Sequence, residues 1–387
     1  PGFVHTAYAL LRYPEVAEGL EATLPPPNLL TAHAEWFWPP GGNGHNAPRV
    51  SGQLCWSNAS LVTFLTEQSR AVLRAQPHAR LLYISQMDNA LNCSSRAEIA
   101  INAVEGSPVG AMLRAVNAIA AALSSEFPQV TFSTLAYTWS QPPPRVTRPH
   151  SNVAVTLCTI MSDFARPLSH ALNAPFARDL AGWAALSPRL HVWDYATNFD
   201  EYFTPFPIWH ALVHNARLYH RSGVVGVFSE GIYNTAGGDL SPLKNYLVAK
   251  LLMDPTIDAD ATIGEFLDGY YGSHAAPHLR SYMALMEGAA QANSSIAMGE
   301  SFGVDAPFLT PPVVLAAART LAAAQRATAQ HQVCSLCARY VQRVEEAAMP
   351  VMYVGLRRWG ALRRYHEENE GEGGGDYWPF APSVTEQ

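Results

Sequence analysis

Apolar runs of strand length alternate with longer segments of helical period between about residue 52 and residue 253. The longer segments, such as 62–75 (VTFLTEQSRAVLRA) and 108–127 (PVGAMLRAVNAIAAALSSEF), carry apolar residues at i, i+3 and i+4, which predicts amphipathic helices. The shorter runs are apolar on both faces, as is typical of buried parallel strands. Counting the opening run as well, we predict strands over 2–11, 80–86, 129–139, 152–160, 189–199 and 224–231.

This alternation predicts an α/β fold in which helices cover a parallel sheet. A closed (β/α)8 barrel needs eight strands, so two interpretations remain: an open doubly wound sheet, or a barrel whose first two strands precede Pro1. No GxGxxG turn follows the first strand, which disfavours a dinucleotide-binding fold. From about residue 258 the pattern is helical throughout. We therefore expect a barrel-type domain over 1–255, a helical region over 256–367 and a flexible tail over 368–387.

The composition limits the kinds of molecule that the protein is expected to bind. The 387 residues carry a net charge of −7 with only 15% charged side chains, and no basic block could follow a phosphate backbone. No apolar run reaches the roughly 18 residues that a membrane span requires. Cys334 and Cys337 form a CxxC without a second ligand pair at zinc spacing. We expect no nucleic-acid partner, no membrane span, no metal and no cofactor, while the oligomeric state stays open.

Carboxylates end three of the predicted strands, namely Asp88, Asp194 and Glu230. In barrels, catalytic groups lie where the strands end. Glycoside hydrolysis uses two carboxyl groups: one protonates the leaving oxygen, and the other supports the developing cation or activates the nucleophile. We predict that Asp88 and Glu230 are this catalytic pair. Six residues close to strand ends are predicted to bind the sugar: His5, Glu35, Asn89, Tyr137, Trp193 and Asp194.

Each of these residues also has a structural interpretation. Asp88 could cap the helix that follows it, because Asp and Asn are good N-caps. Glu230 could be a solvated loop carboxylate in SEGIYNTAGG, and Asp194 could bind a neighbouring backbone amide or an arginine. His5 could be a structural histidine with satisfied hydrogen bonds.

An ordered set of motifs resembles a known family over roughly residues 2 to 285: FVHTAYALL, HAEWF, QLCWSN, ISQMDN, LAYTWSQPPP, NVAVTLC, VWDYATNF and GVVGVFSEGIYNTAGGDLSPLKNYLVAKLLMDP. The family is domain of unknown function 4838, which includes glycoside hydrolase family 163, a group of endo-β-N-acetylglucosaminidases that act on complex N-glycans. The resemblance implies a (β/α)8 TIM barrel in which FVHT ends the third strand and Asp88 ends the fourth. It also implies hydrolysis of a β-linked N-acetylglucosamine, with the substrate's own acetamido oxygen as nucleophile and an oligosaccharide or glycoprotein glycan as partner.

Other classes of function remain as alternatives. A uronide hydrolase would need a cationic clamp, for which Arg145 and Arg148 are the obvious candidates. A catalytically silent carbohydrate-binding barrel would show Asp88 and Glu230 too far apart to bracket a glycosidic bond, beyond roughly 10 Å. A metal-dependent hydrolase lacks a ligand cluster. Because the chain starts at Pro1 and carries sequons at Asn58, Asn92 and Asn293, we expect a secreted protein or one in an endomembrane or lysosome-like compartment.

Overall fold

The structure is a computed structural model that describes residues 4–15, 24–38, 52–233, 237–292, 297–330, 336–369 and 378–380. The chain divides into two compact units. Unit 1 comprises residues 1–159, 177–193 and 222–228, and unit 2 comprises residues 160–176, 194–221 and 229–387. Each unit is described by itself.

Unit 1 contains the short elements of the N-terminal third and most of the sheet. Its helices are α1 (Ala7–Arg12), α2 (Pro27–Ala32), α3 (Ala59–Ala75), α4 (Arg96–Glu105), α5 (Gly110–Leu123) and most of α6 (Ala174–Leu186), with 3-10 turns at Ala34–Trp36 and Thr138–Ser140. Its strands are β1 (Phe37–Trp38), β2 (Gln53–Leu54), β3 (Leu81–Tyr83), β4 (Thr131–Ala136), β5 (Val153–Cys158) and most of β6 (Leu190–Tyr195) and β7 (Gly226–Glu230).

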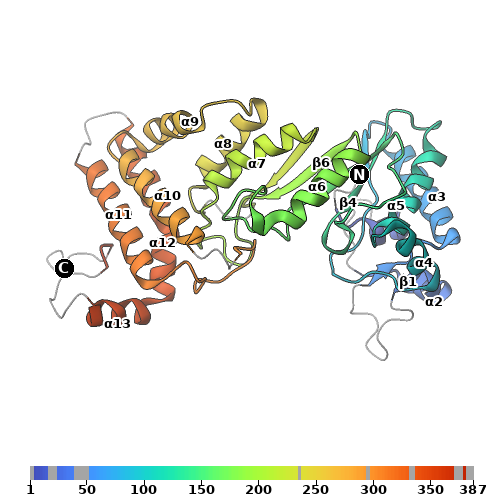
Figure 1. Cartoon of the computed structure of the whole chain (residues 1–387), viewed down its shortest axis with the longest axis horizontal. Helices are drawn as coiled ribbons and strands as arrows, with labels where there is room; N and C mark the ends of the chain where they lie inside the picture. Colours follow the sequence, from blue (N-terminus) through green and yellow to red (C-terminus); the bar gives the residue numbers. More distant parts are fainter. Residues whose placement is uncertain are drawn as a thin grey trace. The chain divides into compact units, whose positions relative to one another are not determined.

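Local sequence explains where the helices of unit 1 begin and end. Asn58 caps α3, because its Oδ1 accepts hydrogen bonds from the amides of Ser60 and Leu61. Ser95 caps α4 in the same way, and Gly106 ends that helix in a left-handed conformation (φ +65°) that glycine adopts without strain. Helices α3 and α5 pack side by side, and α5 also packs on β4 and β5 (Figure 1).

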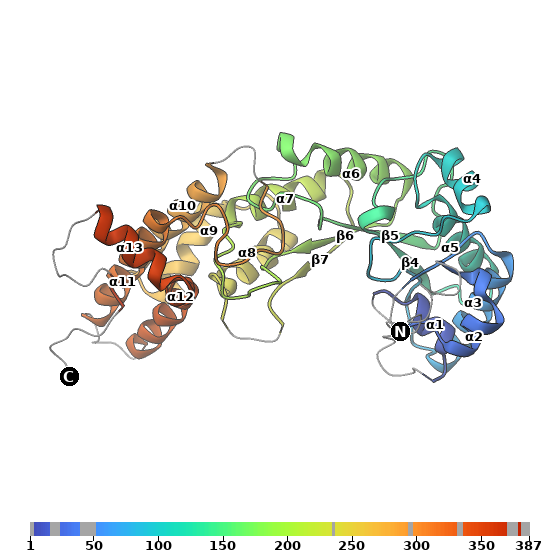
Figure 2. The same cartoon turned by 90° about the horizontal axis from the view of Figure 1, so that it is seen from below.

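The main sheet is a curled half-barrel of parallel strands in the order β3-β4-β5-β6-β7, and Figure 2 shows β4 to β7 following one another in this order. Strands β1 and β2 form a separate antiparallel pair. The register of the main sheet aligns Tyr83 with Ser133, Leu135 with Thr156 and Cys158 with Trp193. Side chains alternate between the faces of a strand, so these residues share one face of the sheet.

The predicted strands from 80–86 onward are confirmed as β3 to β7, but the predicted strand over 2–11 is wrong in the described residues. Ala7–Arg12 is helix α1, and its residues Ala7 to Leu11 are buried. The run AYALLR contains good helix formers and no β-branched residue, and a short apolar run buried on all sides does not reveal its period. The chain just before α1 still lies beside β3, because the Ala7 amide donates to the Ser85 carbonyl at 3.1 Å. A complete (β/α)8 barrel is therefore not present in the described parts of the chain.

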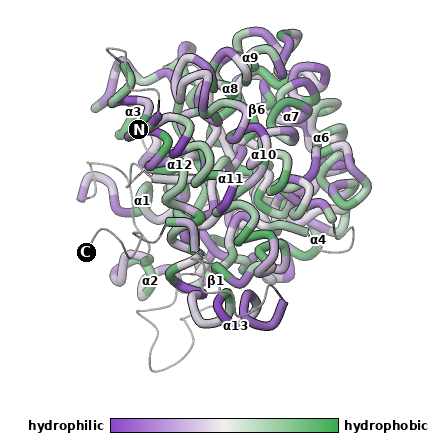
Figure 3. The backbone as a smooth tube through the Cα atoms, turned by 90° about the vertical axis from the view of Figure 1, so that its left-hand side faces the viewer, coloured by the Kyte–Doolittle hydropathy of each residue, from purple (hydrophilic) through white to green (hydrophobic). Residues whose placement is uncertain are grey.

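Unit 2 contains the helical region, as expected for 256–367, together with elements that follow the strands. Its helices are α7 (Trp209–Arg221), α8 (Ser241–Met253), α9 (Ala259–Phe266), a π-helical turn (Leu267–Tyr271), α10 (Ala276–Gln291), α11 (Pro311–Ala329), α12 (Cys337–Arg357) and α13 (Trp359–Asn369), with a 3-10 turn at Ala171–Asn173. Figure 3 shows hydrophobic and hydrophilic positions mixed along α10, α11 and α12, as expected for helices that bury one stripe.

The predicted flexible tail over 368–387 falls largely on residues 370–377 and 381–387, outside the described residues. Within the described part, α13 continues to Asn369. Trp378 is buried, and its ring lies against Gly355, where an added Cβ would clash with it. Among the described helices, no single one is long and apolar enough to cross a membrane; only α4 and α5 taken together, bent by 94°, reach that length and apolarity.

Candidate active site

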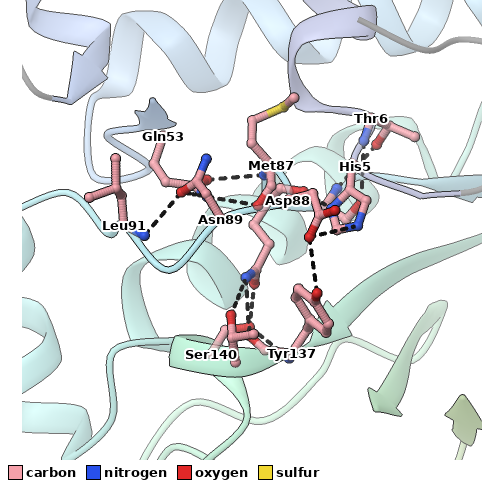
Figure 4. A network of polar contacts seen from close by, with 12 residues as sticks. His5, Thr6, Gln53, Met87, Asp88, Asn89, Leu91, Tyr137 and Ser140 are labelled. Carbon is pink, nitrogen blue, oxygen red and sulfur yellow. Dashed lines mark hydrogen bonds and ion pairs between the residues drawn. The ribbon is translucent and has the colours of Figure 1, made fainter. Parts of the chain in front are cut away.

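Asp88 stands at the centre of a cluster of polar side chains in unit 1. The chain stays buried from Leu82 to Met87 and then emerges, leaving the Asp88 side chain 67% exposed. The Tyr137 hydroxyl, just after β4, donates to Asp88 Oδ1 at 2.9 Å. His5 Nε2, from the segment before α1, lies 3.8 Å from the same oxygen (Figure 4). Three chain segments therefore meet at one accessible carboxylate.

The orientation of His5 is fixed by a second hydrogen bond. Its Nδ1 lies 2.9 Å from the Gln86 carbonyl oxygen, which can only accept, so Nδ1 must carry a proton. In the neutral ring Nε2 is then unprotonated and faces Asp88. His5 also has φ +50°, a left-handed backbone conformation that is uncommon outside glycine. Such conformations gather at functional sites, where surrounding contacts hold them.

Gln86, which follows β3, connects the segment after β3 to the segment after β4. Its side chain is completely buried and uses both ends of its amide. Nε2 donates to the Tyr137 carbonyl at 3.0 Å, and Oε1 accepts from the Ser140 hydroxyl. Because its own carbonyl also holds His5, Gln86 fixes both neighbours of Asp88.

Gln53 of β2 holds the other side of the Asp88 loop and is likewise completely buried. Its Nε2 donates to the Met87 carbonyl at 2.8 Å, and its Oε1 accepts from the Met87 amide at 3.1 Å. The disulfide between Cys55 and Cys93 ties the far end of the loop to the residue that follows β2. The loop that carries Asp88 is thus attached on both sides.

Asn89 is engaged in this same framework. Its Oδ1 accepts from Gln53 Nε2 at 2.9 Å and from the Leu91 amide at 3.0 Å, while its Nδ2 donates to the Gly52 carbonyl at 3.2 Å. These bonds position the loop. The predicted contact of Asn89 with a sugar stays a prediction.

The end of β6 separates two residues that were predicted to act together. Trp193 packs edge-on against Phe228, with ring centroids 4.6 Å apart. Asp194 points to the opposite face, where it is buried and its Oδ2 accepts from the Tyr219 hydroxyl of α7 at 2.9 Å. Burial, followed by the charge of Asp194, raises the pKa of Tyr219 well above its usual range. In this structure Asp194 holds α7.

Glu230 ends β7 and is partly exposed in unit 2. Its carbonyl accepts from the Ala196 amide at 2.7 Å. Tyr202 lies close enough for the Glu230 charge to act on it: burial first, then the hydrogen bond and charge of Tyr233, and then Glu230, raise the pKa of Tyr202 to about 12. The Tyr202 phenol is therefore within electrostatic range of the second predicted catalytic carboxylate.

The remaining predicted residues lie apart from the Asp88 cluster. The Glu35 side chain is 58% exposed, with Oε1 3.5 Å from His33 Nδ1, and no contact between Glu35 and that cluster occurs among the described residues. Arg148 Nη1 donates to the Ala185 carbonyl at 3.3 Å, and the Arg145 amide donates to the Glu105 carbonyl. No group of three or more His, Cys, Asp or Glu that could hold a metal occurs in the part of the chain that the structure describes.

Fold and cluster together define the class: a parallel α/β half-barrel with a carboxylate-centred polar site where two strands end. The chain belongs to the family described as a domain of unknown function (DUF4838), which matches residues 4–284. A comparison with curated proteins found no match.

The sequence interpretation noted Gln86 as a supporting residue at its strand end but missed Gln53 and the phenols of Tyr202 and Tyr233. Gln53 and Gln86 sit in otherwise apolar runs, QLCW and LLYISQM, where an isolated amide signals a buried hydrogen-bonding role. Tyr202 and Tyr233 lie in loops that follow strand ends, in DEYF and GIYN. Their position after strands was the available signal.

Proposed function

We propose that the protein is a glycoside hydrolase that cleaves a β-linked N-acetylglucosamine in N-glycan-type oligosaccharides. The observation that carries the proposal is the exposed Asp88 carboxylate, which accepts a hydrogen bond from Tyr137 and adjoins His5 where strands end. That edge is where α/β barrels place catalytic groups. The choice of N-acetylglucosamine rests on the resemblance of the motifs to glycoside hydrolase family 163.

Asp88 suits the role of an anion that supports the substrate's acetamido group. Tyr137 donates to Oδ1, whereas Oδ2 has no hydrogen-bond partner among the described residues. In the proposed reaction Oδ2 accepts the acetamide N–H, and the acetamide oxygen attacks C1 as the glycosidic bond breaks. Holding the two groups in this geometry accounts for much of the rate gain, because the attack is intramolecular.

The leaving oxygen needs a proton, which a second carboxyl group supplies. We assign it to Glu230, from its place at the end of β7. Glu230 gives its proton to the leaving oxygen, so the departing part leaves as an alcohol. Water then opens the cyclic intermediate at C1 and returns a proton to Glu230, which is general acid and then general base. Asp194 has no part in this scheme, since Tyr219 of α7 binds its carboxylate.

The alternatives receive less support. The uronide proposal needs cations at the carboxylate cluster, yet the Arg145 guanidinium lies against Gly106 and Arg148 Nη1 donates to the Ala185 carbonyl. A silent carbohydrate-binding role is an outcome of the experiment below. The Cys55–Cys93 disulfide supports the further proposal that the protein works in an oxidising compartment, as secreted and endomembrane proteins do.

The test is glycan release from a complex-type N-glycoprotein, followed by intact mass spectrometry. Wild-type protein is expected to leave one N-acetylglucosamine on each glycosylated asparagine, whereas the release rate of Asp88→Asn and Glu230→Gln should fall by about 10³-fold. Asp260→Asn and Glu265→Gln, at exposed positions of α9, are matched controls and should act like wild type. Binding of the free glycan without release by wild type would establish the binding role instead.

A further inference from the structure

A continuous series of aromatic rings crosses unit 2 and ends at the surface. Phe164 and Tyr195 meet edge to face at 6.1 Å, Tyr195 and Phe199 at 5.6 Å, and Phe199 and Tyr202 at 6.1 Å between ring centroids. Tyr202 then meets Tyr233 at 6.0 Å and 83°. Phe164 and Tyr195 are buried, Phe199 and Tyr202 are partly exposed, and Tyr233 is 78% exposed. The Tyr233 ring therefore packs against Tyr202 on one side and is exposed to solvent on the other.

The loop that carries Phe199 and Tyr202 is held by several hydrogen bonds. It follows β6, and its Ala196 amide donates to the Glu230 carbonyl at 2.7 Å. Asn198 is buried and donates from Nδ2 to the Phe302 carbonyl at 2.7 Å, while its Oδ1 accepts from the Phe302 amide. Phe199 is fixed by a backbone bond to Glu300 at 2.8 Å. These bonds hold in place the rings against which Tyr233 packs, which lowers the entropic cost of binding.

Polar groups accompany the exposed ring. The hydroxyls of Tyr202 and Tyr233 interact with each other, and Glu230 is close enough to act on Tyr202 electrostatically. A ligand that fits needs an apolar face to lie on the ring and hydroxyls around its edge to meet phenols and a carboxylate. A neutral pyranose has both features, and tyrosine likewise combines an apolar body with a polar tip. A purely apolar partner would remove water from the carboxylate and phenols at a cost.

We propose that Tyr233 and Tyr202 form a sugar-binding subsite after the end of β7, in which a neutral pyranose of the oligosaccharide stacks on Tyr233. The subsite rests on the proposed glycosidase function, because it places a sugar ring next to the carboxylate that we assign as the general acid. Tyr233 acts by stacking, so its ring and not its hydroxyl is the main contribution.

The experiment measures binding of a free biantennary complex-type N-glycan by calorimetry, in an Asp88→Asn background that prevents turnover. Tyr233→Ala should weaken binding about tenfold, as expected for the loss of one aromatic contact. Tyr233→Phe, which keeps the ring, should stay within about threefold of the parent. Trp359→Ala removes a 42% exposed aromatic of α13 and should leave affinity unchanged. Thermal unfolding checks that each variant is folded.

The outcomes separate this inference from the proposed function. If wild type releases glycans while Tyr233→Ala in the Asp88→Asn background binds the glycan as tightly as its parent, the subsite is overturned and the hydrolase stands. If the protein binds the glycan through Tyr233 but wild type releases none, the subsite stands and the hydrolase fails. If neither wild type nor the Asp88→Asn protein binds the glycan, the subsite is overturned as well.

Discussion

The ends of β3 and β6 carry the same signature in the sequence but differ in the structure. Each apolar run leads to an aspartate, Asp88 in ISQMDN and Asp194 in LHVWDY. The Asp88 side chain is 67% exposed, and its partners are Tyr137, just after β4, and His5, just before α1. Asp194 is only 4% exposed and is bonded to Tyr219 of α7. An acid at the end of an apolar run therefore serves either a site or the packing of a helix.

The position of each acid relative to its strand explains the difference. Asp194 lies inside β6 (Leu190–Tyr195), where the pleat assigns consecutive side chains to opposite faces. Because Trp193 takes one face, Asp194 must take the other. Asp88 lies five positions beyond Tyr83, the last residue of β3, so no pleat directs it into a layer. The comparison teaches that a carboxylate beyond the strand is the better candidate for chemistry than one within it.

The largest expected effect concerns Asp88, the exposed aspartate of this comparison. Asp88→Asn removes the negative charge but keeps the shape and the bond to Tyr137, so we expect glycan release to fall ~10³-fold, as when one charge-stabilising group is lost. The melting temperature should stay within about 1 °C of wild type, since an exposed side chain contributes little to stability. Initial rates by mass spectrometry and a thermal scan measure both. An Asp88→Asn protein with full activity would remove Asp88 from the site.

The second prediction concerns Asp194, the buried aspartate of the comparison. Asp194→Ala leaves the Tyr219 hydroxyl buried without its acceptor, so we expect the free energy of unfolding to fall by ~3 kcal/mol. Activity per folded molecule should be unchanged. Urea denaturation measures the free energy of unfolding, and rates divided by the concentration of folded protein measure the activity. A stable Asp194→Ala protein that has lost activity would restore Asp194 to the substrate-binding role that its sequence position suggested.

The fold was predictable from the sequence where the apolar pattern has a clear period, and not where a short run is buried on all sides. Strands β4 to β7 were predicted because their apolar runs are bounded by helices of clear period. The run AYALLR was not, because its buried residues give no period. Family membership was indicated by the order of motifs and is confirmed over residues 4–284.

Within the candidate site, residue types were easier to predict than partnerships. Strand ends pointed to Asp88, His5 and Tyr137, which the structure brings together. Their partners Gln53 and Gln86 come from segments 33 residues apart, and only three-dimensional pairing shows that both amides are fully used. The face taken by Asp194 depended on strand boundaries, which a pattern of apolar residues does not define to a single position.

Glu105 extends the comparison to a buried carboxylate with a complete set of donors. Burial opposes its ionisation, but hydrogen bonds from Thr147, Arg114 and Val146 outweigh it and lower the pKa of Glu105 to about 2. A carboxyl group with a lowered pKa stabilises the fold at neutral pH, and this contribution is lost as the pH falls from about 4.5 towards about 2. We expect Glu105→Gln to cost ~2 kcal/mol at pH 7.

The measurement is the free energy of unfolding at several pH values for wild type, Glu105→Gln and the exposed control Glu265→Gln. The difference between wild type and Glu105→Gln should shrink as the solution is acidified, whereas the control should follow wild type. A difference that stays constant with pH would mean that Glu105 acts through packing and not through its charge. That result would weaken the distinction between buried and exposed carboxylates drawn from the two strand ends.

The smallest effect comes from a matched pair of phenols and compares the two strand ends directly. Tyr137 and Tyr219 each donate to an aspartate at 2.9 Å, one to Asp88 and the other to Asp194. Tyr137→Phe removes a donor from the exposed carboxylate, so we expect a roughly tenfold fall in kcat/KM with little change in stability. Its fold contacts persist, because Gln86 binds the Tyr137 backbone carbonyl and not the hydroxyl.

Tyr219→Phe should do the reverse, lowering the free energy of unfolding by about 1–2 kcal/mol while kcat/KM stays at the wild-type value. Both variants lose one hydroxyl and keep the ring, so general effects of the substitution cancel between them. Rates and denaturation curves measured side by side give two numbers for each protein. If both variants lost stability alone, the Asp88 cluster would be a packing device like that of Asp194, and position beyond the strand would no longer mark a site.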